Sequence, residues 1–180
     1  MNKQYKQQAA PAKGFTIIEV VLVLAIAGLI FLMVFIALPA LQRGQRDAQR
    51  KQDLSRISVQ MTNYLSSSRG AIPTSDAQVT NFITNYLRRD SDKSNTSLTS
   101  HQTGDDYKDP DGNNYTVGWN TLPTPDSNGV AVIGYYPSKL CDANSGNGDG
   151  VSTTQTAPRD YAFTIKLESQ GIPYCLDNKS

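Results

Sequence analysis

Residues 14–38, GFTIIEVVLVLAIAGLIFLMVFIAL, form a continuous apolar run whose only charged side chain is Glu19. At about 1.5 Å per helical residue, the 24 residues from Phe15 to Leu38 span roughly 36 Å, and the hydrocarbon core of a bilayer is about 30 Å thick. The run therefore predicts a membrane-spanning helix over residues 15–38. A carboxylate in such a helix costs on the order of 2.5–3.5 kcal/mol on insertion scales, so Glu19 needs a partner that neutralises it.

The segment before the run is polar and carries Lys3, Lys6 and Lys13 without any acidic residue. Cleavage between Gly14 and Phe15 would create a positively charged amino terminus at the start of the apolar helix. In a neighbouring copy packed alongside, that amine would lie near the level of Glu19. Two charges that are each costly in lipid would then neutralise one another between subunits, which favours self-assembly.

The stretch KGFTIIEV (residues 13–20), followed by the apolar run, resembles the amino-terminal signature of type IV pilins and the related pseudopilins of type II secretion. The resemblance is specific over residues 13–65 and generic beyond them. It implies that residues 1–14 are a cytoplasmic leader removed by a prepilin peptidase, with cleavage between Gly14 and Phe15. It also implies N-methylation of Phe15, and a filament-assembly role for Glu19.

The amphipathic half of the long helix is expected over residues 39–68. Pro39 and Gly44 weaken it, but residues 45–66 contain neither proline nor glycine. Apolar side chains recur at helical spacing and predict one buried stripe, which consists of Leu54, Ile57, Met61, Tyr64 and Leu65.

The remaining chain predicts a connection and then a sheet. The connection covers residues 69–113, with a short helix over 75–89 and an exposed loop over 90–112. Residues 114–180 predict four strands. Segments 115–119 and 161–168 alternate apolar and polar side chains, 130–136 is a nearly continuous apolar run typical of a central strand, and 172–176 returns as the last strand. The expected fold class is α+β, a pilin fold in which the long amino-terminal helix packs on a four-stranded antiparallel sheet.

Cys141 and Cys175 are the only cysteines, and in an exported domain an even pair predicts a disulfide, here closing a loop over residues 141–175. Two free thiols are the alternative. The only histidine, His101, lies in a Ser/Thr-rich stretch that resembles no catalytic loop, so neither an enzyme nor a cofactor site is expected.

Two acidic, glycine-rich stretches are weak calcium candidates, because calcium prefers hard oxygen ligands on flexible loops. One contains Asp109 and Asp111, and the other contains Asp142 and Asp149. Neither fits an EF-hand, and the first stretch, Asp-Pro-Asp-Gly-Asn over residues 109–113, is also an ordinary turn leading into a strand. The cations from Arg43 to Arg56 are expected to meet lipid headgroups or neighbouring subunits, with DNA as an alternative.

The expected function is thus a structural pilin subunit that sits in the cytoplasmic membrane, amino terminus in the cytoplasm, before it enters an extracellular filament. Its expected partners are further copies of itself, the prepilin peptidase and an inner-membrane assembly platform with its ATPase. DNA or a host-surface ligand would be bound by the filament. The alternatives are a minor pilin, a type II secretion pseudopilin, and a signal-anchored binding domain that does not polymerise.

Overall fold

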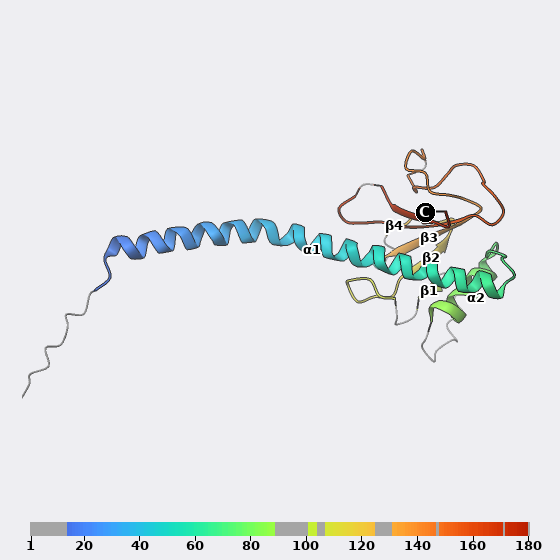
Figure 1. Cartoon of the computed structure of the whole chain (residues 1–180), viewed down its shortest axis with the longest axis horizontal. Helices are drawn as coiled ribbons and strands as arrows, with labels where there is room; N and C mark the ends of the chain where they lie inside the picture. The colour runs from blue at the N-terminus through green and yellow to red at the C-terminus, as the bar shows by residue number, and fades with distance from the viewer. Residues whose placement is uncertain are drawn as a thin grey trace, which may run out of the picture. The chain divides into compact units, whose positions relative to one another are not determined.

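A computed structural model describes residues 14–88, 101–103, 107–124, 131–146, 148–170 and 172–179 of the chain (Figure 1). Of the predicted leader it describes only Gly14, which is exposed and precedes the first helix. The chain divides into two compact units after Leu41. Helix α1 (Ile17–Ser67) contributes residues to both units and continues without a break through Pro39 and Gly44.

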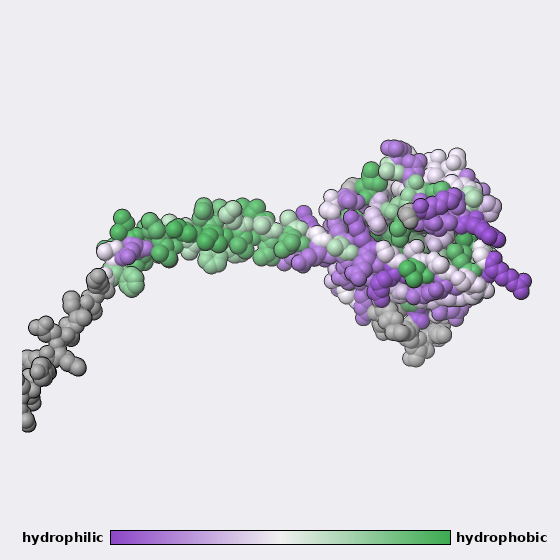
Figure 2. Space-filling view, in the orientation of Figure 1, coloured by the Kyte–Doolittle hydropathy of each residue, from purple (hydrophilic) through white to green (hydrophobic). Residues whose placement is uncertain are grey.

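In the first unit, none of the described residues, 14–41, belongs to the apolar core. Its large apolar side chains are exposed from Phe15 to Leu41, and Figure 2 shows them as a continuous hydrophobic surface. By length and composition this part of α1 is able to cross a membrane. The predicted apolar helix is therefore present, and its apolar surface is available to lipid or to other protein chains.

In the second unit, α1 carries the predicted buried stripe. Leu54, Ile57 and Met61 are fully buried, and Tyr64 is 8% exposed. The helix ends at Ser67, and Arg69 and Gly70 follow with positive φ angles of 56° and 81°. The amide of Gly70 donates to the carbonyl oxygen of Leu65 at 2.7 Å, which closes the helix end.

Two short helical elements follow where the sequence predicts one helix. Helix α2 (Asp76–Phe82) starts at the N-cap Ser75, whose side chain accepts a hydrogen bond from the amide of Gln78. The π-helix η1 (Ile83–Leu87) continues it directly. The Phe82 ring packs edge-on against Tyr64 with ring centroids 5.7 Å apart, so these elements lie beside the end of α1 (Figure 1).

The fold class is α+β, but the sheet is mixed, and its predicted antiparallel arrangement is wrong. Among the described residues, five strands lie side by side in the order β1-β2-β3-β4-β5. All neighbouring strands are antiparallel except β2 and β3, which are parallel. The strands are β1 (His101–Gln102), β2 (Thr116–Trp119), β3 (Val132–Pro137), β4 (Tyr161–Ile165) and β5 (Tyr174–Asp177).

The length of the connection between β2 and β3 explains how they can be parallel. Residues 120–131 separate β2 from β3, and a crossover of about a dozen residues is the length that a parallel pair requires. Thr121, in this crossover, lies against the face of β2 and β3 that carries Gly118 and Gly134. The short strand β1 also falls inside the segment predicted as an exposed loop, and it pairs with β2.

The two faces of the sheet pack against different parts of the chain. The first face packs on α1, α2 and η1 and contributes Val117, Ile133, Tyr135, Phe163 and Ile165 to the main core. The opposite face carries Tyr136 and Ala162, which form a second small cluster with Val151. That cluster lies under the loop that leaves β3 and returns to β4.

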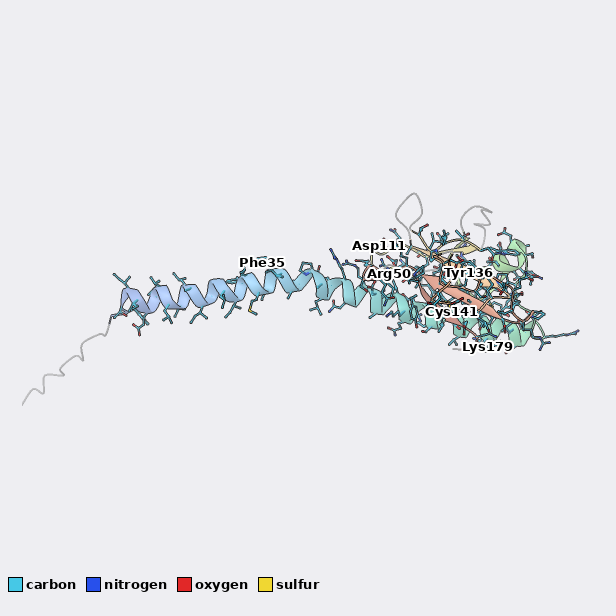
Figure 3. All side chains as sticks on the ribbon, turned by 90° about the horizontal axis from the view of Figure 1, so that it is seen from above. Phe35, Arg50, Asp111, Tyr136, Cys141 and Lys179 are labelled. Atoms are coloured by element: carbon cyan, nitrogen blue, oxygen red, sulfur yellow. A yellow bond between two sulfur atoms is a disulfide. The ribbon has the colours of Figure 1, made fainter. Side chains whose placement is uncertain are left out.

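The predicted disulfide between Cys141 and Cys175 is present and joins this loop to β5 (Figure 3). Cys141 also forms an isolated antiparallel bridge with Val151, and its amide donates to Asp177 Oδ2 at 2.9 Å. The covalent bond therefore fastens this loop to β5 beside the small cluster of Tyr136, Ala162 and Val151.

Candidate functional site

The start of α1 is a capping box built from the two polar residues of the apolar segment. Glu19 Oε2 accepts hydrogen bonds from the amide and the hydroxyl of Thr16, at 3.2 and 3.0 Å. In return the amide of Glu19 donates to Thr16 Oγ1 at 3.4 Å. This reciprocal pairing is the usual way to satisfy the first amides of a helix. It also gives the carboxylate of Glu19 partners within its own chain.

Glu19 borders an open apolar groove of about 400 Å³ along the first turns of α1, lined by Phe15, Glu19, Val20, Val23 and Leu24. Phe15 is 87% exposed, directly after Gly14. The predicted cleavage residues Gly14 and Phe15 precede the predicted assembly residue Glu19 by five and four positions, and Phe15 lines the same groove as Glu19. The groove can make apolar contacts, and it has a single carboxylate, that of Glu19, at its edge.

The second half of α1 is fastened to the segment between β1 and β2 and to the segment after β4 by a network of charges that the sequence analysis missed. Arg50 makes a two-pronged ion pair with Asp109, with Nε–Oδ1 at 2.6 Å and Nη2–Oδ2 at 2.9 Å. Its Nη1 also lies 3.0 Å from Oε1 of Glu168, the residue that Arg46 Nε contacts at 2.7 Å. Arg50, labelled in Figure 3, thus connects two segments of the second unit.

Asp47 binds the backbone that follows β4. Its Oδ1 accepts from the amide of Glu168 at 2.8 Å, and its Oδ2 accepts from the amide of Ser169 at 3.0 Å. The hydroxyl of Ser169 donates to the same oxygen. Burial alone would raise the pKa of Asp47, but the hydrogen bonds from Ser169 and Glu168 outweigh it, and the pKa is lowered.

The pKa values of the other charged groups in the network are also shifted, and their partners explain the direction of each shift. The hydrogen bond from Arg46 lowers the pKa of Glu168, and the bond to Asp109 raises the pKa of Arg50. Asp53 behaves differently, because burial raises its pKa even though the Tyr115 hydroxyl donates to it at 3.0 Å. We call Arg46, Asp47, Arg50, Asp109, Glu168 and Ser169 the clasp.

The clasp changes the interpretation of the cations between Arg43 and Arg56. Arg46 and Arg50 are engaged by acidic residues of the same chain, and Arg56 Nη1 lies 3.1 Å from Asp53 Oδ1. Lys51 stands over the Tyr174 ring at 5.1 Å from its centroid. Most of this strip therefore has intramolecular partners, which weakens the expectation of headgroup or DNA contacts.

The burial of Asp47 and Arg50 could have been predicted from the sequence. Asp47 and Arg50 continue the spacing of the buried stripe toward the amino terminus, since Leu54, Ile57 and Met61 follow at the same helical intervals. Charged residues at stripe positions signal buried ion pairs with another element.

The four calcium candidates have partners of other kinds. Asp109 is held by Arg50, and Asp149 Oδ1 accepts from the Ser145 hydroxyl at 3.0 Å and the Val151 amide at 3.2 Å. Asp111 and Asp142 each accept an amide two residues on, at 3.1 and 3.0 Å, as in ordinary turns. Among the residues that the structure describes, no three His, Cys, Asp or Glu side chains form a group able to hold a metal ion.

Comparisons with known proteins give no relative: no protein-family model, no curated protein and no solved structure matches the chain.

Proposed function

We propose that the chain is a structural subunit of a type IV pilus. It is made as a prepilin in the cytoplasmic membrane, cut after Gly14 by a prepilin peptidase and methylated at Phe15. An assembly platform with its ATPase then moves it from the membrane into a surface filament. The filament serves adhesion, twitching motility or DNA uptake.

The observation that carries the proposal is the apolar surface of α1 together with its single carboxylate. From Phe15 to Leu38 the large apolar side chains are exposed, and monomeric soluble proteins rarely expose contiguous apolar patches above a few hundred Å². Such a surface needs lipid or protein around it. In a pilus subunit, lipid surrounds this helix before assembly, and identical helices surround it afterwards.

Glu19 gives the assembly its register. While the subunit is in the membrane, Thr16 supplies the carboxylate with two hydrogen bonds. In the filament the amine of a neighbour's Phe15 replaces or joins these donors and adds the opposite charge. A subunit displaced by one turn would leave both charges unpaired in an apolar environment, so the pairing penalises wrong registers.

The first test is mass spectrometry of fibres sheared from the cell surface. We expect an abundant chain that begins at N-methylated Phe15, with Cys141 and Cys175 oxidised. A processed chain that is scarce among another subunit's fibres would indicate a minor pilin, and one that is needed only for protein secretion would indicate a pseudopilin. A chain that begins at Met1 and stays in the membrane fraction would contradict the proposal and leave an anchored binding domain.

The second test is Glu19→Gln, which keeps the size and an acceptor for Thr16 but removes the charge. We expect processed chain in the membrane and no surface fibres. The control is Val23→Leu, one turn further along the same apolar groove, which should assemble normally. Oxidised Cys141 and Cys175 in both variants would show that the second unit is folded. Normal fibres from Glu19→Gln would refute the role given to this carboxylate.

A further inference from the structure

The clasp is the first point at which α1 is tied to the rest of the second unit. Residues 42–45 are exposed, and among the residues that the structure describes, Arg46 is the first of α1 to hydrogen-bond with another part of this unit. The buried apolar stripe begins only later, at Leu54. A pull on α1 from its amino-terminal side therefore acts on the clasp before it acts on the stripe.

The clasp connects α1 to two separate segments. Arg50 pairs with Asp109, which precedes β2, through contacts of 2.6 and 2.9 Å. Asp47 accepts the amides of Glu168 and Ser169, which follow β4, at 2.8 and 3.0 Å. A displacement of α1 along its axis would stretch both sets of bonds at once.

The bonds of the clasp depend more steeply on distance than the contacts of the stripe. A hydrogen bond requires alignment and is lost when its atoms separate by less than about 1 Å beyond the usual length. The apolar contacts of Leu54, Ile57 and Met61 are non-directional, so they are partly kept while one surface slides over another. The clasp therefore resists a small displacement of α1 more strongly than the stripe does.

The charges of the clasp are also shielded from water. The side chains of Asp47, Arg50 and Asp109 are 6%, 12% and 1% exposed. A displacement that separates them leaves charges unpaired before water can solvate them, and such a state is costly. This cost raises the barrier to pulling α1 out of the second unit.

The carboxyl end of the chain lies beside the other end of α1. Asn178 Nδ2 donates to the carbonyl oxygen of Arg159 at 3.4 Å, and the Arg159 guanidinium carbon lies 3.5 Å from the place of a Cβ on Gly70, just after α1. In Figure 3, Lys179 is accordingly nearer that end of the helix than Arg50 is. A force applied just before the clasp and at the carboxyl end therefore loads α1 lengthwise against the sheet.

We propose that the clasp sets the force at which α1 is pulled out of the second unit, beyond its share in equilibrium stability. Forced unfolding is governed by the unfolding rate, and this rate responds fully to interactions that are absent from the transition state. Because the clasp breaks first on this path, its loss appears almost entirely in the unfolding rate. The proposal concerns residues 42–179 and does not depend on filament assembly.

The test is force spectroscopy of the full chain in detergent micelles. DNA handles are attached to cysteines introduced by Gln42→Cys and Ser180→Cys, with the native disulfide kept oxidised. At a constant force, Asp47→Asn should raise the rate of the first unfolding event at least about tenfold, because bonds to a buried charge are weakened. Glu168→Gln removes a partly exposed partner charge of two arginines and should raise the rate about threefold.

The matched control is Gly134→Ala, which strains the sheet without touching α1. Its Cβ would lie 2.6 Å from the backbone oxygen of Thr121, on the face of β3 opposite the main core. This variant should lower equilibrium stability about as much as Asp47→Asn does. It should nevertheless change the rate of the first unfolding event under force less than about twofold, because α1 leaves before the sheet yields.

Two results would overturn the proposal. The first is an unchanged unfolding rate under force in both clasp variants, measured on chains whose urea unfolding shows that they are folded. The second is an effect of Gly134→Ala on this rate as large as that of Asp47→Asn at an equal loss of equilibrium stability. The clasp would then contribute to overall stability alone.

Discussion

Asp47 Oδ1 accepts the backbone amide of Glu168 at 2.8 Å, although 121 positions separate the two residues in the chain. The bond joins the middle of α1 to the segment after β4, and Ser169 adds two more donors to the same carboxylate. The Asp47 side chain is only 6% exposed, so little water competes for these bonds. In the second unit, the clasp is thus the polar continuation of the apolar stripe.

Asp47→Asn should lower the free energy of unfolding by about 2–3 kcal/mol, because it weakens bonds to a buried charge and turns an amino group toward a donor. For a unit of this size, that corresponds to a fall in Tm of roughly 5–10 °C. Circular dichroism of the full chain in detergent micelles during heating would measure it. Asp111→Asn, at an exposed turn carboxylate, is the matched control and should change stability by less than about 0.5 kcal/mol. Equal effects of the two variants would contradict the importance of the clasp.

The clasp should also make stability depend on pH. The pKa values of Asp47 and Glu168 are lowered in the folded state, so their contribution is complete above the unfolded values of about 4. It is lost as the pH falls through the lower, folded values. We therefore expect the midpoint of urea unfolding to drop as the pH falls below about 4.

Two variants separate the clasp from general acid unfolding. The double variant Asp47→Asn and Glu168→Gln should be less stable at pH 7 and show a flatter pH dependence. Asp53→Asn should remove a gain in stability that appears above about pH 4 as the pH falls, since burial raises the pKa of Asp53 and the folded state takes up that proton first. An unchanged slope in the double variant would assign the acid sensitivity to other carboxylates, such as Asp160, whose pKa Lys179 lowers.

The sequence predicts the elements of this fold better than their arrangement. The apolar run and the stripe at Leu54, Ile57 and Met61 identify α1, because burial on one face of a helix imposes its period directly on the sequence. The apolar run at β3 correctly indicates a strand buried on both faces, at the centre of the sheet. Alternation along β4 likewise marks a strand.

The direction of a strand cannot be predicted from the spacing of its apolar residues. The alternation along β2 and the apolar run at β3 are the same whether the two strands run parallel or antiparallel, so the mixed sheet was missed. Strand β1 has two residues, too few for any pattern. The clasp was missed because Asp47 and Arg50 are charged, and charged residues on a helix are usually at its surface.

Removal of the disulfide should destabilise the loop that it closes. The bond joins Cys141 to Cys175, which are 34 positions apart in the sequence. The loop-entropy model gives about 3–4 kcal/mol for closing a loop of this length. The double variant Cys141→Ser and Cys175→Ser should therefore melt roughly 10 °C below the wild type. Hydrogen exchange should show the largest loss of protection at Val151 and in β5, and a smaller loss at the α1 stripe, which exchanges through global unfolding. Uniform loss of protection throughout the second unit would contradict this local role.

Gly134→Ala tests the close approach of the β2–β3 crossover to the sheet. A Cβ at this position would lie 2.6 Å from the backbone oxygen of Thr121 and 2.6 Å from Thr164 Oγ1. The backbone atom is not free to move away as a side chain would, so the crossover or the strand has to shift. Overpacking of this kind costs about 1–3 kcal/mol, and we expect the upper part of that range. Gly146→Ala is the matched control, because a Cβ there meets no atom within 4 Å. Urea unfolding of both variants would measure the difference, and equal midpoints would show that the crossover does not pack on β3 as closely as the structure has it.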